Sequence, residues 1–145
     1  MTLLGEFQCA TNGDGRLKIP AELWPELDEG LTLTRGIERC LFAYPTSEWQ
    51  KLVDKIKHRL PLTNRDARAF GRLMFSAALT CTPDSQGQIP LPENLRQYAE
   101  IQESAVVIGV GTHLEIWNPQ LWQKTREQMV EASIAIVEKL SELGV

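Results

Sequence analysis

Short apolar stretches separated by Gly, Pro, Asn and Asp recur along both halves of the chain, a pattern that predicts β-strands joined by turns. The expected strands are residues 5–10, 16–19, 31–35 and 40–44 in the first half, and 77–82, 88–91, 105–110 and 113–117 in the second. Short helices are expected after Pro20 and Pro92, because proline favours the first turn of a helix. Each half therefore has the predicted element order ββαββ.

Three longer stretches have the spacing of amphipathic helices. After Pro45, apolar residues fall at i, i+3, i+4 and i+7: Trp49, Leu52, Val53 and Ile56. A second helix is expected over residues 65–75, after a break at residues 61–64. The third begins at Asn118-Pro119, a capping residue followed by proline, and is expected to run on as one long helix.

The second half of the chain repeats a segment of the first. The segment NGDGRLKIPAEL at residues 12–23 returns as DSQGQIPLPENL at residues 84–95. Half of a 145-residue chain is near the size at which a single hydrophobic core becomes marginal. The two halves are therefore expected to be related units that bury their apolar faces against each other or against another copy.

Each copy of the repeat opens with a polar turn. Asn12 and Gly15 in the first copy correspond to Asp84 and Gly87 in the second. Asn, Asp and Gly tolerate the positive φ angles of tight turns, and the Asn and Asp side chains accept hydrogen bonds from nearby backbone amides. We interpret these four residues as turn-forming, and we expect the strands on either side of each turn to pair as a hairpin.

The net charge of −4 argues on average against a nucleic-acid partner, because phosphates attract basic surfaces. The charges are segregated along the chain, however. Basic residues gather between positions 51 and 72: Lys51, Lys55, Lys57, Arg59, Arg65, Arg68 and Arg72. Acidic residues gather near the C-terminus: Glu127, Glu131, Glu138 and Glu142. The basic cluster either guides DNA or an acidic neighbouring subunit, or is a solvated helix face.

The residue types needed for catalysis are scarce. The chain has only two histidines, His58 and His113, and shows no Ser/His/Asp or Cys/His grouping, phosphate-binding loop or metal-ligand spacing. We therefore expect no enzymatic activity, no metal or other cofactor and no small-molecule substrate.

A soluble protein of the reducing cytoplasm is expected. No apolar run approaches the roughly 20 residues that span a bilayer, and the first residues lack the pattern of a secretory signal. Three widely spaced cysteines form no CxxC pair. Cys9 and Cys81 are expected to fill small spaces in the core, since free cysteine is usually buried.

Four further motifs follow the turns in order: residues 33–36 (LTRG), 40–45 (CLFAYP), 48–49 (EW) and 107–111 (VIGVG). Together with the two glycine-basic-strand-proline copies, they resemble the MraZ family of bacterial transcriptional regulators over essentially the whole chain. The resemblance implies two swapped-hairpin (AbrB-like) β-barrel units in one chain, assembly into a ring, and binding to short direct repeats upstream of the cell-division and cell-wall gene cluster.

On this basis the chain divides into four parts. The first AbrB-like repeat is placed at residues 6–48 and the second at residues 77–120. Linking helices occupy residues 49–76, and a C-terminal amphipathic helix occupies residues 121–145.

Each copy departs from the family's D-x-x-x-R motif at one position. The first copy has Asn12 and Arg16, and the second has Asp84 and Gln88. The resemblance implies that the motif's arginine contacts DNA, so Arg16 is the stronger candidate and the contact of Gln88 is in doubt.

The candidate DNA-binding residues are Arg16, Lys18 and Gln88. An arginine on a β-ribbon can donate two hydrogen bonds to the O6 and N7 atoms of guanine in the major groove. The alternative for Arg16 is a structural ion pair with Asp14 or Asp84. Lys18 projects from the same face and suits a phosphate or solvent, and Gln88 suits adenine or a phosphate.

These observations predict a sequence-specific DNA-binding transcriptional regulator associated with the nucleoid. The alternative is a ring-forming assembly or interaction protein that has lost DNA binding, because both motif copies are incomplete and the net charge is negative. The two hypotheses differ in the salt-dependent binding of repeated duplex DNA that each predicts.

Overall fold

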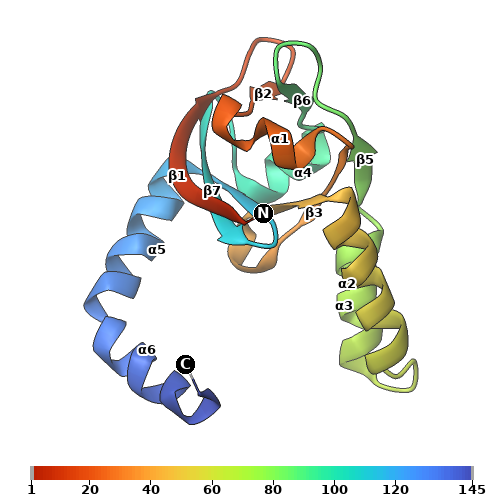
Figure 1. Ribbon diagram of the computed structural model, residues 1–145, viewed down its shortest axis with the longest axis vertical. Coiled ribbons are helices and arrows are strands. Elements are labelled where there is room, and N and C mark those ends of the chain that lie inside the picture. Colours follow the sequence, from red (N-terminus) through yellow and green to blue (C-terminus); the bar gives the residue numbers. More distant parts are fainter. Residues whose placement is uncertain (1, 145) are drawn as a thin grey trace.

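The structure is a computed structural model that describes residues 2–144. In this part of the chain, six strands form one antiparallel sheet and two form a separate ribbon (Figure 1). The strands are β1 (Leu3–Ala10), β2 (Arg16–Lys18), β3 (Leu31–Arg35), β4 (Leu41–Pro45), β5 (Leu79–Cys81), β6 (Gln88–Pro90), β7 (Ser104–Gly111) and β8 (Leu114–Trp117). The helices are α1 (Trp24–Leu27), α2 (Thr46–Arg59), α3 (Arg65–Phe75), α4 (Glu93–Ala99), α5 (Pro119–Glu131) and α6 (Ser133–Leu140), with short 3-10 segments η1 (Ala21–Leu23), η2 (Ile37–Arg39) and η3 (Ser141–Leu143). The predicted α+β class is confirmed.

The two halves of the chain are interleaved within the sheet. Its strand order is β1-β7-β8-β4-β3-β5, so that strands of the first half pair with strands of the second, as β1 does with β7 and β3 with β5. The ribbon also combines the halves, because β2 pairs with β6. Each repeat therefore completes the sheet and the ribbon of the other.

Two of the expected hairpins are present in the structure, and two are not. Strand β3 pairs with β4, and β7 pairs with β8, as the sequence predicts. The predicted pairing of the strands on either side of each polar turn is wrong. Strands β1 and β2 share one isolated bridge, between Thr11 and Leu17, and otherwise belong to different sheets. An isolated two-stranded hairpin is marginally stable in water, and pairing with the other half places β1 in a six-stranded sheet instead.

The sheet is open. Within residues 2–144, β1 and β5 are its two edge strands and do not pair with each other. The expectation of closed β-barrel units is therefore corrected: the β2–β6 ribbon with α1 and α4 covers the open sheet instead (Figure 1).

The main hydrophobic core lies between the sheet and the ribbon. Both halves contribute fully buried side chains to it, among them Leu17, Leu33, Ile89 and Val107. Leu17 and Ile89 are direct partners in the ribbon, which ties the ribbon to the core. Cys9 is buried in this core, and Cys81 is half-buried at its margin.

A second apolar cluster lies on the opposite face of the sheet. Val106 and Ile108 belong to it whereas Val107 belongs to the main core, as alternation along a strand requires. Trp117 and Trp122 complete one side of the cluster, with ring centroids 5.5 Å apart. This cluster anchors the longer helices to the sheet.

Two helical arms extend from the sheet on the side away from the ribbon (Figure 1). We call the helix pair α2 and α3 the linker arm, and the helices α5 and α6 with η3 the C-terminal arm. The two arms lie at opposite sides of the molecule (Figure 1). No helix among residues 2–144 has the length and apolar character needed to cross a membrane.

The C-terminal helix is broken, which corrects the expectation of one long helix. Helix α5 ends at Glu131, Ala132 has a ψ of 7°, and α6 restarts at Ser133. Trp122 is the buried residue of α5, and α6 has none. Helical stability in proteins comes mostly from packing, and α6 has no buried residue, so within residues 2–144 no packing against the sheet supports a straight helix beyond Ala132.

Candidate nucleic-acid interface

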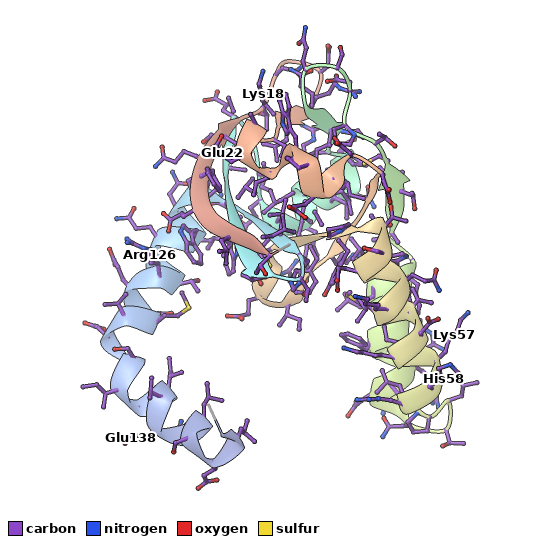
Figure 2. The ribbon with its side chains drawn as sticks, viewed as in Figure 1. Lys18, Glu22, Lys57, His58, Arg126 and Glu138 are labelled. Atoms are coloured by element: carbon purple, nitrogen blue, oxygen red, sulfur yellow. The ribbon has the colours of Figure 1, made fainter. Side chains whose placement is uncertain are left out.

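The two copies of the repeated motif meet in the β2–β6 ribbon. Arg16 lies opposite Pro90, and Lys18 lies opposite Gln88. Between them, the buried pair of Leu17 and Ile89 points into the core, so the alternation of the strand directs Arg16 and Lys18 to the outer face. The ribbon therefore carries the three candidate residues Arg16, Lys18 and Gln88 at the end of the molecule opposite the arms (Figures 1 and 2).

Two equivalent turns form the tip of this region. Asn12 Oδ1 accepts hydrogen bonds from the backbone N–H groups of Asp14 at 3.0 Å and Arg16 at 2.9 Å. Asp84 Oδ1 accepts from the N–H groups of Gln86 and Gln88, both at 2.9 Å. The amide and the carboxylate therefore hold the same turn, so that the change from Asp to Asn at position 12 preserves its geometry.

Backbone hydrogen bonds connect each turn to a strand end of the other half. The Ile19 N–H donates to the Gly87 carbonyl at 2.9 Å, and the Leu91 N–H donates to the Gly15 carbonyl at 3.0 Å. These two bonds are equivalent under the internal repeat, which maps Ile19 onto Leu91 and Gly15 onto Gly87. Each turn is thus fixed by a strand end from the other half.

Trp24 and Arg96 occupy equivalent positions, each one residue beyond the repeated segment, and have equivalent roles. Trp24 Nε1 donates to the Ile19 carbonyl at 2.7 Å, and Arg96 Nε donates to the Leu91 carbonyl at 3.0 Å. Trp24 then packs on Gly87, whereas the Arg96 guanidinium packs on Gly15. Sequence reasoning missed Arg96, although extending the repeat by one residue would have aligned it with Trp24.

Arg16 forms an ion pair with Asp84 rather than with Asp14, the other partner considered. Arg16 Nη2 lies 3.7 Å from Asp84 Oδ2, and both side chains are 37% exposed. The backbone amides of Gln88 and Gln86 lower the pKa of Asp84, with further attraction from Arg16 and Lys18. The carboxylate is therefore ionised at neutral pH, but a pair this long and exposed binds the guanidinium only weakly.

The two histidines lie apart from the ribbon and from each other. The His113 ring stacks on Tyr44 with ring centroids 4.4 Å apart, and burial lowers the pKa of His113. His58 is exposed near the end of α2 (Figure 2). In the described part of the chain, no group of three His, Cys, Asp or Glu side chains is placed to hold a metal ion.

Comparison with known proteins places the chain in a family. Residues 2–73 and 74–141 each match the sequence model of a family described as "MraZ protein, putative antitoxin-like". The chain belongs to the MraZ family. The two matches divide the chain into halves that agree with the internal repeat.

Curated relatives cover nearly the full chain. The transcriptional regulator MraZ of Alkaliphilus oremlandii is 44% identical over 98% of this chain and 99% of its own length. Those of Caldicellulosiruptor saccharolyticus and Clostridium acetobutylicum are each 42% identical, over 99% and 98% of this chain and 99% of their own lengths. All three are named as regulators of transcription.

The two copies of the repeated motif differ at positions that the structure brings together. The internal repeat maps Arg16 onto Gln88 and Asp84 onto Asn12. The ion pair between Arg16 and Asp84 therefore has a neutral counterpart, Gln88 and Asn12. The two equivalent pairs of positions therefore differ by one cation and one anion, which makes the ribbon asymmetric.

Proposed function

We propose that this chain is a DNA-binding regulator of transcription and that the outer face of the β2–β6 ribbon contacts duplex DNA. The observation that carries the proposal is the position of Arg16 and Lys18 on the outer face of a ribbon whose inner face is anchored in the core. The names of the curated relatives support it. Arg96 beside the first turn adds a third cation to the same end of the ribbon.

The ribbon has the residue types for major-groove recognition. A two-stranded ribbon fits the groove, and Arg16 can donate to guanine once it leaves Asp84. Lys18 binds a phosphate, and Gln88 binds adenine or a phosphate without releasing a counterion. The half of the ribbon that carries Arg16 therefore supplies most of the affinity.

The wider function follows the family resemblance. In this proposal the interleaved halves are AbrB-type swapped-hairpin units, with repeats at 6–48 and 77–120, linking helices at 49–76 and a C-terminal segment at 121–145. Copies of the chain assemble into a ring. The ring binds short direct repeats upstream of the cell-division and cell-wall gene cluster, in the cytoplasm and on the nucleoid.

The test compares Arg16→Ala and Asp84→Asn in a salt-titrated mobility assay on duplex DNA carrying the repeats. Arg16→Ala should weaken binding about tenfold or more, since a bidentate arginine contributes about 1–3 kcal/mol of base discrimination. Asp84→Asn keeps the oxygen that holds the turn, as Asn12 does, and frees the guanidinium, so it should strengthen binding.

Lys124→Ala is the matched control, because it removes one positive charge from α5, away from the ribbon. It should bind as the unmodified protein does. Equal affinities of Arg16→Ala and the unmodified protein would overturn the assignment of Arg16.

The alternative function is an assembly protein without DNA binding. The ion pair of Arg16 with Asp84 and the neutral Gln88 favour it, because within residues 2–144 Lys18 is then the one cation among the three candidate positions that makes no salt bridge. This alternative predicts no retention of repeated DNA by the unmodified protein even at low salt.

A further inference from the structure

The C-terminal arm has an apolar surface that nothing in the described chain, residues 2–144, covers. All the side chains of α6 are exposed, and Val130, Ile134 and Val137 are 65%, 75% and 63% exposed. A free helix of this length is marginal in water, because most helical stability in proteins comes from packing of an apolar face. The arm therefore requires a partner surface.

The linker arm also buries its apolar residues incompletely. No residue of α2 is fully buried, and the apolar stripe of Leu52, Val53 and Ile56 is only half-buried. Leu62, in the loop between α2 and α3, is 84% exposed. This arm can accept further apolar contact along its length.

The linker arm and the outer part of the C-terminal arm carry opposite charges. Residues 46–75 hold seven basic and three acidic side chains. In the C-terminal arm, Lys124 and Arg126 lie in the first part of α5, where Arg126 forms an ion pair with Glu6 of β1, and the residues beyond them, 127–144, hold four acidic side chains and one basic side chain. Most of these charges have no ionic partner within residues 2–144: Lys55, Lys57, Arg59, Arg65, Arg68, Arg72, Glu127, Glu131, Glu138 and Glu142. The linker arm and the outer part of the C-terminal arm thus carry excess charge of opposite sign beside exposed apolar residues.

Basic residues on α2 and acidic residues on α5 each form a row along one side of their helix. Lys51, Lys55 and Arg59 are spaced four residues apart along α2, so they share one side of the helix. Glu127 and Glu131 are spaced likewise on α5. Attraction between such rows steers association and fixes the register of the contact.

The arms of one molecule do not meet. They leave the sheet at opposite sides, and Lys57 and Glu138 mark their outer parts in Figure 2. Complementary surfaces on opposite sides of one subunit make a head-to-tail contact, which generates a ring when the rotation between subunits closes.

We propose that the C-terminal arm of one copy docks on the linker arm of a second copy, with its apolar face against α2 and α3 and its glutamates against their basic rows. The inference rests on the proposed ring and names the surfaces that join its subunits. A lipid surface is the poorer occupant, because membranes carry anionic headgroups and the exposed end of this arm is acidic.

The test uses two charge-reversal variants of the full chain. The first carries Lys55→Glu and Arg59→Glu on the linker arm, and the second carries Glu131→Lys and Glu138→Lys on the C-terminal arm. Each variant brings like charges together in a head-to-tail contact, so light scattering after size-exclusion chromatography should show monomers for both. Mixed in equal amounts, the two reversed arms are complementary to each other and should recover larger species.

A matched control reverses two acidic residues outside the arms, Glu22→Lys and Glu103→Lys, and should assemble like the unmodified protein. Circular dichroism of each variant should show the unmodified helical content, so that loss of assembly is separated from loss of fold.

Three outcomes would overturn the inference. One is an assembly that survives both reversals. The second is a linker-arm variant that still assembles while the C-terminal variant does not, which indicates that C-terminal arms pair with each other. The third is co-sedimentation of the unmodified protein with vesicles containing phosphatidylserine. A protein that is monomeric at every concentration would overturn the ring as well, and the DNA assay decides the remaining part of the proposed function separately.

Discussion

Gly15 and Gly87 share a left-handed φ of +75° but have different neighbours. A Cβ at position 87 would lie 2.3 Å from the Trp24 ring, whereas one at position 15 would lie 3.2 Å from the end of the flexible Arg96 side chain. Either Gly→Ala substitution costs roughly 1–2 kcal/mol for the left-handed backbone, and Gly87→Ala adds overlap with a rigid ring. We expect Gly87→Ala to lower the free energy of unfolding more, as measured by urea denaturation.

The control is a double-mutant cycle with Trp24→Ala, which removes the ring that the new methyl group meets. The combined variant should lose less stability than the sum of the two single changes. Equal losses for Gly15→Ala and Gly87→Ala would contradict the contact between Gly87 and Trp24.

Local chemistry made the turn residues predictable, whereas their partners depended on tertiary structure. The side chains of Asn12 and Asp84 accept hydrogen bonds from amides two and four residues away. Such contacts are local, so a short stretch of sequence is enough to predict them. The choice of Asp84 over Asp14 as the partner of Arg16 depends on the register of β2 against β6. The approach of Arg96 to Gly15 depends on the same pairing.

Helix α5 is held at its start by one asparagine with two functions. Asn118 Oδ1 accepts from the N–H groups of Gln120 and Leu121, and Asn118 Nδ2 donates to the Glu100 carbonyl at 2.7 Å. Asn118→Ala removes the cap and the tether, so it should cost about 1–2 kcal/mol or more. Asn118→Ser keeps a capping oxygen but not the amide donor, and should lie between Ala and the unmodified protein in thermal denaturation.

A serine variant as unstable as the alanine variant would show that the bond to Glu100 outweighs the cap. A serine variant as stable as the unmodified protein would show that the tether contributes nothing.

Elements that depend on neighbouring residues were predicted well, and those that depend on distant residues were not. The hairpins β3–β4 and β7–β8 have short connections, and both were correctly predicted. The pairings β1–β7 and β2–β6 join strands far apart in the sequence, and periodicity carries no information on such partners. The break at Ala132 occurs where packing ends, which the apolar pattern of the helix does not reveal.

The ribbon and the arms lie at opposite ends of the molecule, so assembly through the arms leaves the ribbons free (Figure 1). A ring of this kind presents several ribbons, and linked contacts can raise affinity by about 10²–10⁴ over a single contact. We therefore expect duplexes with several direct repeats to bind much more tightly than a duplex with one, as measured by fluorescence anisotropy.

The linker-arm variant with Lys55→Glu and Arg59→Glu separates assembly from DNA contact in this assay. It should lose the gain from multiple repeats and keep the affinity for a single repeat. If the unmodified protein binds single and multiple repeats equally, the multivalent mechanism is wrong.

The first strand of the chain has its partner far downstream, since Leu3 pairs with Gly111. Ribosomes add about 5–20 residues per second, so β1 emerges several seconds before β7 has been made. During that interval the nascent first repeat displays apolar residues such as Phe7 and Leu17, which belong to a core that the second repeat completes. Each newly made molecule therefore passes through a period in which chaperones and proteases have access to it, and translation must reach the second repeat before that period can end.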